Sequence, residues 1–164
     1  MNDAKDQGGD GSNQSAIAGQ SPVSRREVGL DIMRRVIGEQ YFAKRQSNTN
    51  AFNADLRCLS EEYCFGEIWA RPGLERKFRS MLCIAMLVAL NRGHELRLHV
   101  SGAINNGCTV EEIKEVLLQA TVYCGLPSGV EGVRIAEEAL RELGIELGEA
   151  NKPMLSALDE VADQ

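Results

Sequence analysis

Glu95 and His99 are the side chains of this sequence best suited to proton chemistry. They are four residues apart in a segment with helical spacing, so they lie on one face of the helix and within reach of each other. A neighbouring carboxylate tends to raise the pKa of a histidine from about 6.5, which favours a proton donor at neutral pH. Arg92, three residues before Glu95, lies near the same face. The alternative is a surface ion pair that caps the helix.

A second group of candidate residues lies in and after residues 66–72, where the helical pattern breaks. Loops on a rigid scaffold often carry function, and Trp69 belongs to this segment, with packing over the domain as the alternative. A guanidinium group binds a carboxylate through paired hydrogen bonds, so the arginines that follow are candidates for anion binding. These are Arg71, Arg76 and Arg79, of which Arg79 is favoured because it begins an apolar helix.

Metal and thiol chemistry are not indicated by the histidines and cysteines. The two histidines, five residues apart, do not form a credible zinc site. The cysteines include no C-x-x-C pair, and three of them interrupt apolar helical runs. We expect Cys83 to pack in the core and Cys108, beside a turn, to be the exposed one. The sequence therefore predicts reduced core thiols in a cytoplasmic protein, at positions 58, 64, 83, 108 and 124.

Composition restricts the class of protein. The chain has 164 residues, of which 43% are hydrophobic and 26% charged, which suits a single domain with one core. Its net charge of -6 argues against nucleic acid as a partner, because phosphate backbones require a broad basic surface. No apolar run approaches the roughly 18 to 20 residues that cross a bilayer, so we expect no membrane partner.

The elements that must position the candidate side chains are helices, because apolar residues recur at helical spacing without β alternation. A first stripe consists of Leu30, Met33, Val36 and Ile37. A second consists of Phe52, Leu56, Leu59 and Tyr63. A third helix over about residues 74–91 is apolar around most of its circumference, and we expect it to be the buried centre.

Local signals set the ends of the later helices. A fourth helix spans about residues 94–105 and ends at an NNG turn, where glycine accepts the left-handed conformation. Thr109 and Glu112 form a T-x-x-E capping box that begins the fifth helix. A glycine and a proline end it, and a last helix follows over about residues 130–143.

The two ends of the chain differ from its middle. Residues 1–25 are rich in Gly, Ser, Asn, Gln and Asp, and they have little to bury, so we expect a flexible polar tail. Residues 146–164 form an extension. It has the pattern of a short amphipathic helix through Met154, Leu155, Leu158 and Val161.

Several short motifs follow one another between residues 66 and 129: GEIW, RPGLE, ELRLH, NNG, EEIKEVLLQ and YCGLP. In this order they resemble the carboxymuconolactone decarboxylase family, small helical proteins related to the alkylhydroperoxidase AhpD, and they look like its decarboxylase branch. The resemblance covers about residues 28–143. It implies an all-α fold, a single AhpD-like domain of about six helices over residues 26–145, and assembly into homotrimers or homohexamers.

The activity that this resemblance implies is decarboxylation of 4-carboxymuconolactone to β-ketoadipate enol-lactone, a step in protocatechuate breakdown. No metal or other cofactor is implied, and the expected partner is a small lactone carboxylate. His99, held by Glu95, would protonate the dienolate or hydrogen-bond the lactone oxygen, and Glu67 of the GEIW element would be a second acid or base. The predicted substrate-binding residues are Arg71, Arg76, Arg79, Arg97, Trp69 and Tyr123.

Two alternatives remain at this point. One is a thiol peroxidase of the AhpD type, whose active helix resembles C-x-x-C-x-x-x-H. Aligning its histidine with His99 places Arg92 and Glu95 at the cysteine positions, and neither forms a thiolate. The other is a family member with a different lactone or acid substrate, or with no catalytic activity.

Overall fold

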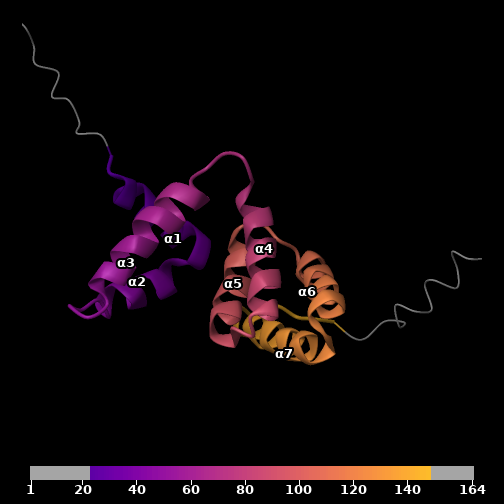
Figure 1. The fold of residues 1–164 in the computed structure, drawn as a ribbon. Helices are drawn as coiled ribbons and strands as arrows, with labels where there is room; N and C mark the ends of the chain where they lie inside the picture. Colours follow the sequence, from indigo (N-terminus) through magenta and orange to yellow (C-terminus); the bar gives the residue numbers. More distant parts are fainter. Residues whose placement is uncertain (1–22, 149–164) are drawn as a thin grey trace, which may run out of the picture.

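A computed structural model describes residues 23–148, and every regular element in that range is a helix (Figure 1). The all-α prediction is therefore confirmed. The predicted polar tail up to residue 22 and the predicted helix from Met154 to Val161 lie outside the described residues. The helices are α1 (Arg25–Ile37), α2 (Glu39–Ser47), α3 (Ala54–Leu59), the π-helix η1 (Ser60–Trp69), α4 (Arg76–Ala89), α5 (Gly93–Asn105), α6 (Val110–Cys124) and α7 (Leu126–Glu142).

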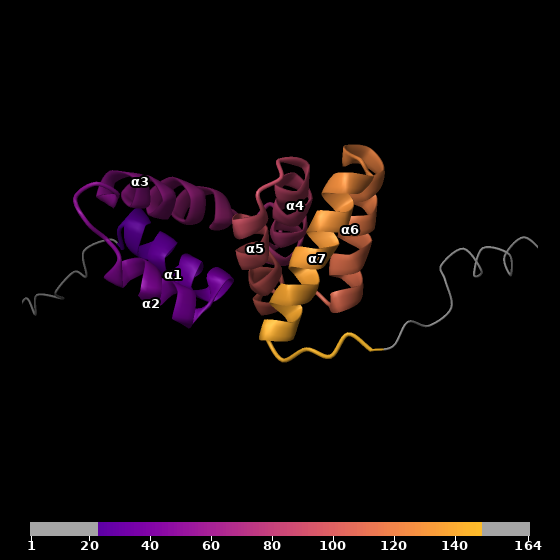
Figure 2. The same ribbon diagram turned by 90° about the horizontal axis from the view of Figure 1, so that it is seen from below.

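The helices form two groups that lie side by side (Figures 1 and 2). The first group contains α1, α2, α3 and η1 and buries one cluster of apolar residues, among them Met33, Val36, Phe65 and Trp69. The second group contains α4 to α7 and buries a larger cluster, including Ile84, Val100 and Leu117. Residues 70–75 connect the groups, and α1 packs against α5 across the boundary.

The close packing of α1 against η1 depends on two glycines. A Cβ atom on Gly29 would lie 1.8 Å from the backbone oxygen of Glu61, and one on Gly66 would lie 2.3 Å from that of Arg25. Both distances are far inside van der Waals contact, so only glycine permits this approach. Glu61 itself is buried between the two helices and is held by Arg26 of α1 and Arg45 of α2.

The helix ends follow the local signals with one exception. Thr109 accepts a hydrogen bond from the backbone of Glu112, and the Glu112 side chain accepts one from Thr109, so the predicted capping box is present. Gly107 adopts φ +85° in the predicted turn. The last helix, however, begins at Leu126 rather than near residue 130. Pro127 lies in its first turn, where proline is favoured, and therefore begins this helix instead of only ending α6.

One apolar stripe of the sequence is exposed, and one prediction about burial is wrong. The second apolar stripe is exposed: Phe52 is 99%, Leu56 70%, Leu59 54% and Tyr63 55% exposed. In its place Glu61, Phe65 and Trp69 face α1. The helix α4 was expected to be the buried centre, but it buries only one face, with Ile84 and Val88. On the opposite face, an apolar side chain at every fourth position is about half exposed or more: Phe78, Leu82, Met86 and Leu90.

None of the helices described in residues 23–148 combines the length and the hydrophobicity that a membrane-spanning segment requires.

Candidate active site

The helix α5 presents different side chains to three neighbouring helices. Gly102 and Asn105 meet α1, because a Cβ on Gly102 would lie 2.9 Å from the backbone oxygen of Val36, and the Asn105 amide donates to the same oxygen at 3.3 Å. Asn105, expected to be part of the turn, thus also joins the two groups of helices. Arg97 meets α7 on another side.

His99 lies on the side of α5 that faces α4. The Asn106 side chain, just after α5, donates to the Ser80 hydroxyl of α4 at 2.9 Å. Arg92 and Asn106 are the cap residues at the two ends of α5, each seven positions from His99, so the helical repeat places all three near this side. Glu95, four residues before His99, belongs to it as well. We call this set of four residues the α4-facing side of α5.

The protonation of His99 differs from the prediction. The side chain is half-buried, and burial lowers the pKa of His99 below its usual range, while the charge of Glu95 opposes this effect only in part. The reason is that burial disfavours the charged imidazolium, whereas Glu95 is exposed and water screens its field. In the free protein the imidazole is therefore mostly neutral at pH 7.

Arg97 is on a different side of α5 from His99. Its guanidinium group forms ion pairs with Glu138 and Glu142 of α7. These pairs hold α5 against α7 and leave Arg97 directed away from the α4-facing side. The structure thus does not bring this predicted carboxylate-binding residue to His99.

The predicted residues of η1 lie where the two groups of helices meet. Trp69 is 5% exposed and stacks on Phe65, with ring centroids 5.8 Å apart. Leu98 of α5 and Cys83 of α4 pack against the cluster that contains Trp69. Leu98 immediately precedes His99, so α5 contacts the cluster at the end of η1 one residue before the candidate histidine. A π-helix is rare and occurs frequently at functional sites.

Glu67, two residues before Trp69, remains partly accessible. Its carboxylate is 3.4 Å from the Arg25 guanidinium and 3.8 Å from that of Arg71, and all three side chains are at least 41% exposed. Such exposed pairs contribute little to stability, so Glu67 and Arg71 stay available to a ligand.

Arg79 and Arg76 have different surroundings at the beginning of α4. The Arg79 guanidinium donates to the backbone oxygens of Leu74 and Arg71, both at 3.1 Å, and thereby fixes the connection between the two groups of helices. Two of its three nitrogen atoms are thus occupied. Arg76, the first residue of α4, is half-buried and forms no ion pair with another described residue.

Tyr123 does not belong to this region. It is 79% exposed at the end of α6, and α6 packs mainly against α4 and α7 and only slightly against α5. The structure therefore does not bring Tyr123 to His99.

The cysteines are placed differently from the prediction. Cys108, expected to be exposed, is buried and its thiol contacts the backbone oxygen of Lys77, whereas Cys64 and Cys124 are exposed. Cys83 is half-buried, and burial raises the pKa of its thiol to about 11. Burial also raises the pKa of Cys58, Cys64 and Cys108. These thiols are poor nucleophiles, since the thiolate is the reactive form.

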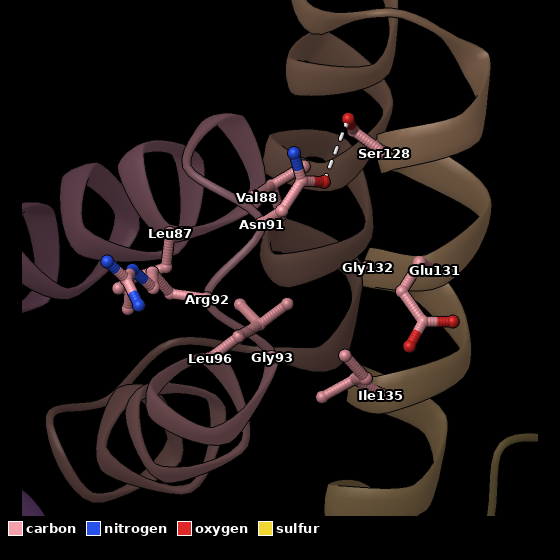
Figure 3. A pocket seen from close by; sticks show the side chains of 10 residues that line it. All are labelled: Leu87, Val88, Asn91, Arg92, Gly93, Leu96, Ser128, Glu131, Gly132 and Ile135. Carbon is pink, nitrogen blue, oxygen red and sulfur yellow. Dashed lines mark hydrogen bonds between the residues drawn. The ribbon is translucent and has the colours of Figure 1, made fainter.

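A small pocket lies at the connection between α4 and α5, beside α7 (Figure 3). Its volume is about 80 Å³, and Val88, Leu96 and Ile135 supply an apolar lining. On its rim the Ser128 hydroxyl donates to the Asn91 side chain at 3.1 Å. His99 does not line it, and ligand-binding pockets usually have volumes of about 300–1,000 Å³, so we do not assign this pocket as the active site.

Glu61 was not among the residues predicted from the sequence. Its buried carboxylate accepts hydrogen bonds from Arg26 at 2.8 Å and from Arg45 at 2.6 Å. A charged residue is almost never fully buried unless it is paired, and the two arginines lie 35 and 16 residues away in the chain. Only its position four residues before Phe65 on the buried face of η1 could have indicated this role. Across residues 23–148, no cluster of three His, Cys, Asp or Glu side chains could hold a metal ion.

Comparison with known proteins gives consistent results. Residues 56–138 match the carboxymuconolactone decarboxylase family. A 4-carboxymuconolactone decarboxylase from Acinetobacter baylyi is 40% identical over 128 residues, which cover 78% of this chain and 96% of that protein. The nitrosuccinic acid decarboxylase npaB from Metarhizium robertsii is 36% identical over 127 residues, covering 77% and 88% of the two chains. The motif order, the helical fold and these relatives agree, and the chain belongs to the carboxymuconolactone decarboxylase family.

Proposed function

We propose that this chain is a decarboxylase that converts 4-carboxymuconolactone to β-ketoadipate enol-lactone without a cofactor. The observation that carries the proposal is the 40% identity to a 4-carboxymuconolactone decarboxylase along 96% of that relative. The reaction would place the chain in protocatechuate breakdown. Cytoplasmic residence is part of the proposal, and the five free cysteines support it, because disulfides are rare in the cytosol.

The substrate carries its own electron sink. When the bond to the departing carboxylate breaks, carbon dioxide leaves and the electron pair passes through the ring double bond to the lactone carbonyl. The resulting dienolate then takes a proton at the carbon next to that carbonyl. The protein therefore needs to hold the remaining carboxylate, stabilise the negative charge that develops on the lactone oxygen and deliver one proton.

His99 is the proposed proton donor. Its lowered pKa leaves the imidazole mostly neutral in the free protein. A bound anionic substrate raises the pKa of a nearby histidine, because opposite charges favour the charged form. Substrate binding would thus draw a proton from solvent onto His99, and the imidazolium would return to its neutral form when it protonates the dienolate. Glu67, partly accessible at the end of η1, is a candidate second acid or base.

Turnover of histidine variants tests this proposal. A positioned acid contributes roughly 10²- to 10⁴-fold, so His99→Ala should lose about that factor in kcat for carbon dioxide release from 4-carboxymuconolactone. His94 offers a matched control, because it is the other histidine of α5 and is exposed on a different side. His94→Ala should stay near wild type. Equal activity of the two variants would remove His99 from the mechanism.

A second candidate substrate follows from the second relative. The name of npaB specifies nitrosuccinic acid, and that relative is 36% identical to this chain. Nitrosuccinate also carries two carboxylates and an electron sink, since loss of the carboxylate beside the nitro group leaves a nitronate. Parallel measurement of carbon dioxide release from both acids distinguishes them, and the substrate with the higher kcat/KM is the better assignment.

We also propose that the chain forms a homo-oligomer, a trimer or a hexamer. The support is the exposed stripe of α4, formed by Phe78, Leu82, Met86 and Leu90, together with the exposed second stripe on α3 and η1. Large exposed apolar patches on a folded domain mark sites of interaction with other proteins or with ligands. Leu82→Glu should shift sedimentation toward the monomer while circular dichroism stays unchanged, because Leu82 is 54% exposed. A strictly monomeric wild type at micromolar concentration would contradict the proposal.

A further inference from the structure

Two arginines of the described chain differ from all the others in having no oxygen partner. Arg76 and Arg92 form neither an ion pair nor a side-chain hydrogen bond within residues 23–148. The remaining arginines of this range are held by carboxylates or by backbone and hydroxyl oxygens. A guanidinium group without a protein partner is free to bind an anionic ligand.

Arg92 is the one of these two that lies on the same helix face as His99. The two residues are seven positions apart, which is close to two helical turns, and Arg92 is the exposed N-cap residue of α5, where it also borders the small pocket beside α7. In Figure 3 the Arg92 side chain extends toward Leu87 of α4 and away from Glu131 of α7. Glu131 is itself paired with Arg134.

Arg92 and Glu95 are three residues apart, but the structure shows no ion pair between them in the described chain. Glu95 is exposed, and Arg92 is the residue that precedes the first turn of α5. The guanidinium group is therefore not neutralised by its nearest carboxylate on the helix. By contrast, Arg97 is bound to two carboxylates of α7 and would have to break both pairs to meet a ligand.

We propose that Arg92, and not Arg97, binds a carboxylate of the substrate on the α4-facing side of α5. This rests on the proposed decarboxylase function. Seven residues of helix span about 10.5 Å, so a ring held between the two side chains would have its retained carboxylate at Arg92 and its reacting carbons near His99. The planar guanidinium suits this role, because it donates two parallel hydrogen bonds to one carboxylate.

The test compares arginine variants by steady-state kinetics with 4-carboxymuconolactone and by competitive inhibition with succinate, a dicarboxylate that cannot react. Loss of a hydrogen bond to a charged group weakens binding roughly 10- to 100-fold, so Arg92→Gln should raise both KM and the inhibition constant by about that factor. We expect kcat to change much less. Arg92→Lys should be intermediate, since it keeps the charge and loses the paired geometry.

Two further variants complete the comparison. Arg97→Gln tests the rival assignment and should leave KM and the inhibition constant within about threefold of wild type, and Arg141→Gln, whose guanidinium pairs with Glu137, is the surface control. A KM for Arg92→Gln within threefold of wild type, or a larger rise for Arg97→Gln, would overturn the proposal. If the wild type releases no carbon dioxide from the lactone, the proposed substrate fails. Calorimetric titration with succinate then still decides the role of Arg92: weaker binding to Arg92→Gln supports it, and equal binding refutes it.

Discussion

Replacement of Glu61 by glutamine is expected to lower the free energy of unfolding by about 3 kcal/mol. The carboxylate is 1% exposed and accepts hydrogen bonds from Arg26 and Arg45 at 2.8 and 2.6 Å. Removal of one partner of a buried ion pair costs about 3–5 kcal/mol, because the other charge is left buried without compensation. Arg45 is only 13% exposed, but Arg26 is 49% exposed and can turn to water, which places the expected cost at the lower end.

The pH dependence of this effect follows from the pKa of Glu61. Burial raises that pKa, but the hydrogen bonds and charges of Arg26 and Arg45 outweigh burial and hold the pKa below its usual range. The stabilisation is therefore complete above the unfolded-state pKa of about 4.3 and is lost as the pH falls through the lower folded-state value. The difference in unfolding free energy between wild type and Glu61→Gln should be constant near neutral pH and should shrink toward about pH 3.

Urea unfolding followed by circular dichroism at a fixed protomer concentration measures this difference, since assembly makes stability depend on concentration. Glu67→Gln is the matched control on the same π-helix. Its carboxylate is 41% exposed, and its loss should cost at most about 1 kcal/mol. The reasoning would be refuted if Glu61→Gln unfolded like the control at pH 7, or if its deficit were undiminished at pH 3.

Three further predictions follow from the structure. Gly29→Ala should destabilise the fold by about 3 kcal/mol or more, because the new methyl group would lie 1.8 Å from the Glu61 backbone oxygen. A melting temperature equal to that of wild type would contradict this prediction. Substrate binding at pH 7 should take up close to one proton, and kcat/KM should fall as the pH rises, because the pKa of His99 is lowered in the free protein. Calorimetry in buffers of different ionisation enthalpy measures this proton uptake. If no proton is taken up, His99 is excluded as the group that becomes charged. Iodoacetamide should label the exposed Cys124 in the folded protein but not the buried Cys108, and decarboxylation should persist. Mass spectrometry and the carbon dioxide assay check both points, and activity lost in step with labelling of a single thiol would count against a cysteine-free mechanism.

Much of the fold was predictable because its signals are local. The end of α5 at residues 105–107 depends on a glycine with positive φ, and the beginning of α6 depends on the Thr109 and Glu112 side chains, all of which act within a few residues. The stripe from Leu30 to Ile37 predicted a helix with one buried face, and α1 buries Met33, Val36 and Ile37.

The same periodicity did not predict what covers each apolar face. Leu82 and Met86 have helical spacing as regular as that of Ile84 and Val88, yet only the latter pair is buried in the chain. A hydrophobic period shows that a helix has an apolar side, but it does not identify the neighbour that packs there. Within the described residues, α4 is covered on the face that holds Ile84 and Val88, and its other face is exposed.

The sequence by itself determined that an acid and an imidazole share one face of a helix, because a spacing of four residues fixes that relation in any α-helix. The tertiary structure decided the rest of the candidate site. Burial by surrounding helices lowers the pKa of His99, which the neighbouring Glu95 alone would raise. Carboxylates on α7, more than forty residues along the chain, occupy Arg97, whereas no described residue forms an ion pair with Arg92. Desolvation and charge pairing depend on distances through space, and a linear sequence does not specify which distant side chains meet.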